Sequence, residues 1–66
     1  MSRDIIKSRW PQIRGKLKRK WSKLTDDDVD FLEGEREYLV GKLQERYGIA
    51  KEKAEVQVKE FERSLH

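Results

Sequence analysis

Basic and aromatic residues are concentrated at the start of this 66-residue chain, and together they suit the binding of a polyanion. Residues 1–24 contain nine Lys or Arg and one acidic residue. Lys16, Arg19 and Lys20 are the cations that we expect to contact phosphate, while Trp10 and Trp21 are of a type that stacks on bases. The segment therefore indicates nucleic-acid binding by a basic N-terminal helix. The stronger interpretation is that both Trp, which lie on one apolar stripe, are core residues and that the cations form a solvated face.

An acidic segment follows directly after the basic one. Residues 25–37 contain seven acidic residues and one basic residue, and the net charge of the whole chain is +3. A basic first third beside an acidic middle can neutralise itself within the fold, and it then needs no external partner.

The triplet Asp26-Asp27-Asp28 has the carboxylates that either a calcium site or a helix N-terminus uses. An EF-hand loop requires alternating ligands, a central Gly and a distal Glu, and this segment has none of them at the required spacing. Thr25 followed by Asp28 instead resembles a capping box, with further acidic residues in the first turn. We therefore predict a helix that begins after Thr25, and no metal site.

Residue types that commonly carry catalysis are scarce. The chain has no Cys and one His, the terminal His66. Gly15-Lys16 and Gly41-Lys42 lack the preceding glycines of a phosphate-binding loop. The carboxylates lie in highly charged segments, an environment that does not raise a pKa as acid–base catalysis requires. We predict no enzymatic activity and no cofactor.

Helix is the regular structure that the apolar spacing supports. A first helix is predicted from a stripe at steps of three and four residues, with Pro11 in its first turn. Its members are Trp10, Ile13, Leu17, Trp21 and Leu24. A short second helix has Val29, Phe31 and Leu32 as its apolar side.

Two more helices are predicted in the second half. Leu39, Leu43 and Tyr47 form a stripe that ends at Gly48, where a left-handed C-cap is expected and Ile49 fastens the turn to the core. The last helix runs from about Ala50 to Ser64. Gly34 either separates the second helix from the third or lies within one unbroken helix at a cost of about 1 kcal/mol. The pattern leaves both possibilities open.

A repeat at a spacing of 26 residues relates residues 4–21 to residues 30–47, most clearly in Gly15-Lys16-Leu17 and Gly41-Lys42-Leu43. Repeats this short cannot bury their own apolar faces, so we expect the two copies to pack on each other in one domain of residues 1–66. Gly15 and Gly41 lie inside their helices, and we predict that each marks a close approach between helices.

Composition limits the remaining choices. Charged residues make up 44% of the chain and hydrophobic residues 35%, so the core is small. No apolar run is long enough for a membrane span and no signal peptide is recognisable, which predicts a cytoplasmic protein. Four apolar residues lie off the main stripes and are expected to remain available for self-association: Ile5, Ile6, Val40 and Val56. We therefore expect a monomer or a weak homodimer, and the sequence identifies no other partner.

The combined motifs resemble the CsbD-like family, small hydrophilic bacterial proteins associated with general stress responses. The resemblance covers about Trp10 to Phe61 and rests mainly on Lys23-Leu24-Thr25-Asp26-Asp27-Asp28 and Gln44-Glu45-Arg46-Tyr47-Gly48. Ser22, where members commonly have Gly, and Pro11, where Lys is more usual, depart from the pattern. The resemblance implies an all-α fold, a small four-helix bundle of two crossed helical hairpins similar to the sterile-alpha-motif architecture.

The resemblance also implies a role in stress survival without defining a mechanism. The function we predict is that of a non-enzymatic bacterial general stress-response protein that acts through its charged surface. A dense shell of both charge signs keeps such a chain soluble and holds water near it. Nucleic-acid binding through Lys16, Arg19 and Lys20 is the alternative.

Overall fold

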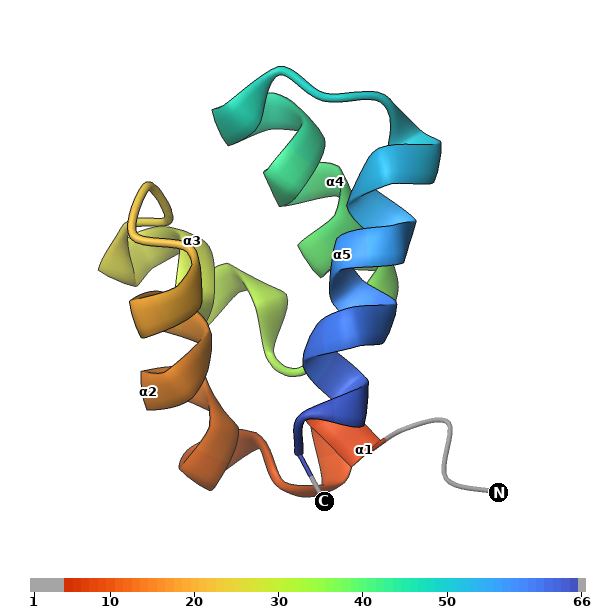
Figure 1. The fold of residues 1–66 in the computed structure, drawn as a ribbon. Helices are drawn as coiled ribbons and strands as arrows, with labels where there is room; N and C mark the ends of the chain where they lie inside the picture. The colour runs from red at the N-terminus through yellow and green to blue at the C-terminus, as the bar shows by residue number, and fades with distance from the viewer. Residues whose placement is uncertain (1–4, 66) are drawn as a thin grey trace.

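The computed structural model describes residues 5–65, and every regular element within them is an α-helix. The helices are α1 (Ile5–Ser8), α2 (Trp10–Lys20), α3 (Asp26–Leu32), α4 (Arg36–Tyr47) and α5 (Lys51–Arg63). Figure 1 shows α4 and α5 side by side, with α2 on the other side of the molecule and α3 near the C-terminal end of α2. The predicted all-α class is confirmed for this part of the chain. The short helix α1 is additional to the four helices predicted, and Asp4 and His66 lie outside the described residues.

Helix α2 begins where the sequence predicts. Trp10 is its first residue, and Pro11 occupies the first turn, where its missing N–H removes no helical hydrogen bond. Ile13 and Leu17 are buried on its inner face, and the helix ends at Lys20. The prediction that Trp21 and Leu24 continue the same helical stripe is therefore wrong, and both are buried from the turn that follows the helix. Basic residues fill its last turn, beside the negative end of the helix dipole.

Helix α3 is started by the predicted capping box and stopped at Gly34. The Asp28 N–H donates to Thr25 Oγ1 over 3.0 Å, and the Thr25 N–H donates to Asp28 Oδ2 over 3.1 Å. At the other end, Glu33 and Gly34 both have positive φ, of 48° and 80°. Two successive left-handed residues cannot continue an α-helix, so α3 ends before Gly34 and α4 starts in a new direction.

Gly34 also provides the close approach that was predicted at other glycines. A Cβ placed on Gly34 would lie 2.9 Å from the Cα of Lys7 in α1. At Gly15 and Gly41, in contrast, a Cβ would have no neighbour within 4 Å, and both residues are exposed. The prediction that Gly15 and Gly41 mark close contacts within the chain is therefore wrong. Each has a helical-propensity cost of about 1 kcal/mol relative to Ala that no contact within the described residues explains.

The α4–α5 turn follows the sequence closely. Gly48 has φ 63° and its N–H donates to the Gln44 carbonyl over 2.9 Å, as expected of a left-handed C-cap. Ile49 packs against the core and is partly buried. Ala50 is the N-cap of α5 and is exposed, whereas Ala54, Val58 and Phe61 are buried.

The core is formed where α2, α4 and α5 meet and is sealed by residues from the loops and from α1 and α3. Leu17, Leu43, Ala54 and Val58 have no exposed surface. Ile6 brings α1 into the same cluster, which explains why α1 belongs to the fold despite its four residues. Throughout residues 5–65, no helix combines the length and the apolar character needed to cross a bilayer.

Candidate functional site

One side of α2 is neutralised by α3. Arg14 Nη2 lies 2.6 Å from Asp30 Oδ1, and Lys18 Nζ donates a hydrogen bond to the Asp26 carboxylate. The hydrogen bond from Lys18 and its positive charge lower the pKa of Asp26. The acidic middle of the sequence therefore pairs with part of the basic first third, as the charge distribution indicates.

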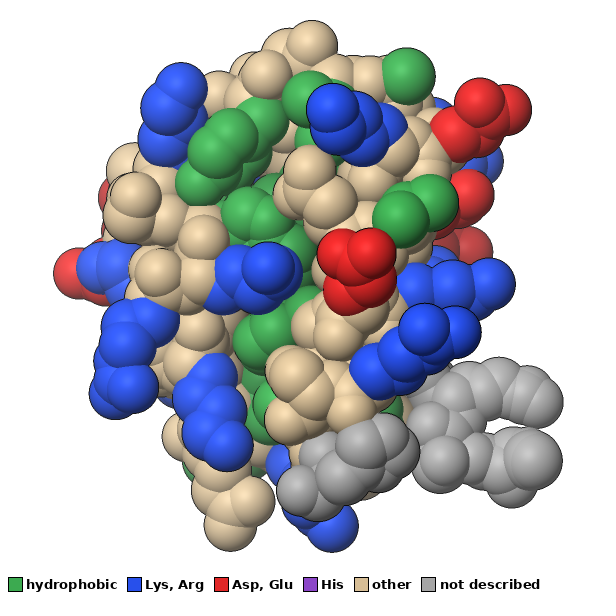
Figure 2. Space-filling view, viewed as in Figure 1, with side chains coloured by type: hydrophobic (Ala, Val, Ile, Leu, Met, Phe, Trp, Pro, Cys, Tyr) green, Lys and Arg blue, Asp and Glu red, His purple; other side chains and the backbone are tan. Residues whose placement is uncertain are grey.

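The three predicted phosphate contacts lie away from these pairs, and we name them the basic α2 face: Lys16, Arg19 and Lys20. All three side chains are exposed, and among residues 5–65 no carboxylate oxygen lies within 4.0 Å of their charged groups. Lys20 Nζ lies 5.4 Å from the Trp21 ring centroid. Figure 2 shows Lys and Arg side chains over the α2 side of the molecule, and others over the α5 side. The structure thus brings the three residues to one helix surface, and their ligand stays a prediction.

The two Trp residues contribute to the fold. Trp21 is 3% exposed, and its ring meets that of Phe61 edge-on with centroids 5.1 Å apart. Its Nε1–H donates to Gln57 Oε1 over 3.0 Å, which satisfies the indole donor. Trp10 is half-buried against the core. Stacking on bases is therefore not open to Trp21, and any polyanion would contact α2 mainly through charge.

Exposed aromatic residues occur instead on α3 and α4. Phe31 is 57% exposed and Tyr38 is 49% exposed, with ring centroids 5.1 Å apart. The expectation that Phe31 lies on the buried side of its helix is wrong. Val29 and Leu32 form the buried side of α3, and Phe31 is exposed to solvent. A shallow depression of about 320 Å³ lies here, and we name it the aromatic groove. It is lined by Phe31, Glu37, Tyr38, Gly41, Lys42 and Glu45.

The apolar residues predicted to stay available for association are mostly buried. Ile6 and Val40 are 2% and 5% exposed, and Ile5 is partly buried against the core. Val56 is exposed. The association surface predicted from these positions is therefore wrong, apart from Val56.

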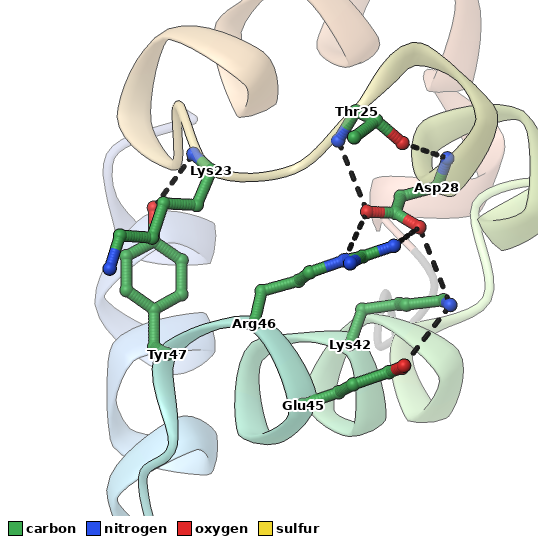
Figure 3. A network of polar contacts seen from close by, with 7 residues as sticks. All are labelled: Lys23, Thr25, Asp28, Lys42, Glu45, Arg46 and Tyr47. Carbon is green, nitrogen blue, oxygen red and sulfur yellow. Dashed lines mark hydrogen bonds and ion pairs between the residues drawn. The ribbon is translucent and has the colours of Figure 1, made fainter.

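Asp28 is the buried charged residue of the described chain and forms the centre of a polar network between α3 and α4. Its carboxylate accepts from Arg46 Nε over 2.7 Å and from Arg46 Nη2 over 2.9 Å, a bidentate pair. Lys42 Nζ lies 3.4 Å from Oδ1 and also reaches Glu45. Figure 3 shows how the cations of α4 point toward the first turn of α3.

These contacts set the charge state of Asp28. Hydrogen bonds from Arg46, together with those from the Thr25 N–H and Lys42, outweigh the desolvation of a 4% exposed carboxylate and hold the pKa of Asp28 far below its usual range. The pKa of Arg46 is raised by the same pair. With both oxygen atoms occupied, Asp28 joins two helices and has no free lone-pair direction for a substrate.

Sequence reasoning found one half of this network and missed the other. Thr25 and Asp28 are three residues apart, a spacing that a capping box makes recognisable. Arg46 lies far along the chain from Asp28, and no local pattern links them. The signal that could have pointed to this pair is that Asp28 and Arg46 both lie in the two stretches on which the family resemblance mainly rests.

A second polar contact supports the same region. Tyr47 Oη accepts from the Lys23 N–H over 3.2 Å, and Lys23 Nζ lies 5.2 Å from the Tyr47 ring centroid. The end of α4 thereby holds the loop between α2 and α3 (Figure 3). Within residues 5–65 no cluster of His, Cys, Asp or Glu has the geometry of a metal site, and the Asp triplet acts in capping and ion pairing.

These features define a class: a small, all-helical, highly charged domain in which the buried carboxylate of the described part, Asp28, serves the fold and the surface presents a basic face and an aromatic groove. The chain belongs to the CsbD-like family, whose model matches residues 4–56. The resemblance predicted from the sequence is therefore confirmed.

The relatives come from bacteria. The UPF0337 protein PA4738 of Pseudomonas aeruginosa is 56% identical over 61 residues, covering 92% of this chain and 94% of that protein. The UPF0337 protein XAC4007 of Xanthomonas axonopodis is 52% identical over 65 residues, covering 98% of this chain and 94% of its own length. The UPF0337 protein YjbJ of Escherichia coli K12 is 50% identical over 62 residues, with coverages of 94% and 90%.

Proposed function

We propose that this protein is a non-enzymatic stress-response protein of the bacterial cytoplasm that acts through its charged surface. The observation that carries the proposal is the placement of charge. Charged side chains of both signs cover the helices, several in pairs between helices such as Lys7–Glu35 and Arg36–Glu62, and the buried Asp28 is fully engaged in the fold. Membership in the CsbD-like family supports the same class of role.

The test is protection of a labile enzyme through drying or freezing. We expect more enzyme activity to survive with this protein than with an equal mass of albumin, because a dense mixed-charge shell retains water at its surface. The Lys16→Ala, Arg19→Ala, Lys20→Ala variant should protect nearly as well, since most of the shell remains. Recovery no better than with albumin would contradict the proposal.

We also propose that α2 to α5 form the predicted pair of crossed hairpins in one domain of residues 1–66, similar to the sterile-alpha-motif architecture. Two observations support this arrangement. α4 and α5 pack side by side through the Gly48 turn, and α2 is joined to α3 through Arg14–Asp30 and Lys18–Asp26. In addition, α2 begins at Trp10 and α4 at Arg36, the same offset as the sequence repeat.

Nucleic-acid binding is the second candidate, and the basic α2 face is the observation that favours it. The pairs to α3 leave Lys16, Arg19 and Lys20 without a carboxylate partner in residues 5–65, so their charge is available to phosphates. Because Trp21 is buried, we expect little preference for single strands over duplex.

Replacing all three residues of the basic α2 face with Ala should weaken DNA binding about tenfold or more and reduce the salt slope by roughly two to three. Fluorescence anisotropy of labelled duplex and single-stranded DNA, at about 50 and about 200 mM salt, measures both effects. The matched control is Lys51→Ala, Lys53→Ala, Lys59→Ala, which removes the same charge from exposed positions of α5. Equal losses in the two variants would mean that net charge, and not the basic α2 face, determines binding.

A further inference from the structure

The aromatic groove has the properties of an interaction surface. Phe31 and Tyr38 are about half exposed although each lies beside the other, and Lys42 Nζ sits 5.2 Å from the Phe31 ring centroid. Exposed, adjacent aromatic rings are uncommon on a surface as polar as this one and mark sites where a partner removes them from water. The fold does not use these two rings in its core.

The charge around the aromatic groove specifies the kind of partner. Glu37 and Glu45 line it, and within residues 5–65 Glu37 has no cation within 4.0 Å. A partner with Lys and Arg side chains would meet these carboxylates and place its cations over exposed rings. The basic α2 face of the same protein has these properties and lacks carboxylate partners of its own among residues 5–65.

Two glycines provide a separate reason to bring these surfaces together. Gly41 lines the aromatic groove, and Gly15 precedes Lys16 and lies one helical turn before Arg19. Both are exposed within helices and have open space where a Cβ would be. Glycine is unfavourable in a helix, so its presence at both positions needs a reason. If α2 of one molecule crosses α4 of another at these glycines, the absence of side chains allows the two backbones to approach closely.

The repeat relates the two surfaces to each other. Gly15 and Gly41 occupy equivalent positions, and Arg19 is equivalent to Glu45 at the same offset of 26 residues. The outer faces of α2 and α4 are thus related in position. Their charges are opposite at the Arg19/Glu45 pair, whereas Lys16 and Lys20 correspond to the cations Lys42 and Arg46. A contact between them uses different surfaces on the two molecules, which makes it heterologous and open-ended.

We propose that copies of this protein associate head to tail, with the basic α2 face of one molecule docked in the aromatic groove of the next. The proposal does not depend on the stress role. It requires that the basic α2 face be free of nucleic acid, because phosphate would compete for the same cations.

Sedimentation of nucleic-acid-free protein is the first measurement. We expect the average mass to rise with concentration at about 50 mM salt and to fall toward the monomer at about 500 mM, because the contact is charged and solvent-exposed at its rim. A monomer at every concentration at low salt would overturn the proposal.

A complementation experiment identifies the two surfaces. One variant, Phe31→Ser with Tyr38→Ser, keeps only the basic α2 face; the other, Lys16→Ala, Arg19→Ala, Lys20→Ala, keeps only the aromatic groove. Each alone should be monomeric, whereas an equal mixture should form heterodimers that grow no further. Self-association of either variant alone, as a symmetric dimer through one surface would show, or no heterodimer in the mixture, would contradict head-to-tail docking.

Substitutions at Gly15 and Gly41 distinguish an effect on association from an effect on folding. Gly15→Ala and Gly41→Ala should fold at least as stably as the wild type, yet each should weaken association about tenfold by filling the crossing point. Circular dichroism during heating and sedimentation measure the two properties on the same samples. Unchanged association in both variants would show that the helices do not cross at these residues and would overturn the proposed geometry.

Discussion

Asp28→Asn is expected to lower the free energy of unfolding by about 2–3 kcal/mol, a large part of the stability of so small a domain. The substitution keeps the shape of the side chain but removes the charge that faces Arg46 and Lys42. Breaking a fully buried ion pair costs about 3–5 kcal/mol, and we expect less here because both cations reach solvent. Urea unfolding followed by circular dichroism or by Trp fluorescence measures the loss.

Asp27→Asn is the matched control. Asp27 is exposed in the same first turn of α3, so its replacement removes the same charge and the same interaction with the helix dipole, and leaves the network intact. We expect this variant to lose only about 0.3–1 kcal/mol. Equal losses for Asp27→Asn and Asp28→Asn would mean that the pairing with α4 adds nothing to stability.

The same network predicts how stability depends on pH. Arg46 and Thr25 hold the pKa of Asp28 below its usual range, so the contribution of Asp28 is fully present above the unfolded value of about 3.9. As the pH falls toward the folded pKa, the unfolded chain binds a proton that the folded chain does not, and stability is lost. The difference between wild type and Asp28→Asn should therefore shrink between about pH 4 and about pH 2.

Gly34→Ala is expected to be at least as disruptive, with a loss of about 3 kcal/mol or more. The new Cβ would require a left-handed conformation at φ 80° and would lie 2.9 Å from the Cα of Lys7, a backbone atom that cannot rotate away. Relief requires α1 to move, which withdraws Ile6 from the core. Thermal unfolding measures the loss, at roughly 4–8 °C in Tm for each kcal/mol.

The other glycines of this chain serve as internal controls for Gly34→Ala. Gly48 has a similar φ of 63° but open space at the Cβ position, so Gly48→Ala reports the conformational cost alone, about 1–2 kcal/mol. Gly15→Ala and Gly41→Ala should instead add up to about 1 kcal/mol each. If Gly34→Ala and Gly48→Ala lost the same stability, α1 would not be docked against the α3–α4 turn.

Much of the helical structure could be predicted because its signals are local. The part of the stripe that lies in α2 (Trp10, Ile13 and Leu17), the Thr25–Asp28 capping box and the C-cap at Gly48 all involve residues within one or two turns of each other. Whether the helix ends at Gly34 could not be predicted, since a glycine alone does not determine whether a helix ends. Its φ of 80° and the approach of α1 decide it.

The candidate surfaces were predicted less completely. Lys16, Arg19 and Lys20 were named from composition, and the structure separates them from Arg14 and Lys18, which α3 neutralises. The aromatic groove was missed, because an apolar residue on a helix such as Phe31 is expected to face the core. Whether it does so depends on how much of α3 the neighbouring helix covers, and the sequence does not encode that coverage locally.

The family, the all-helical class, the main caps and the division into a basic and an acidic segment could all be predicted from the amino-acid sequence. These properties arise from residue types and from interactions between near neighbours in the chain. Three further features follow from how the helices pack: Arg46 and Lys42 bind Asp28, Gly34 is the close contact, and Gly15, Gly41 and Phe31 face outward. Each of these outcomes depends on the angle at which one helix meets another, and that angle is set by core packing and by the left-handed turn at residues 33–34.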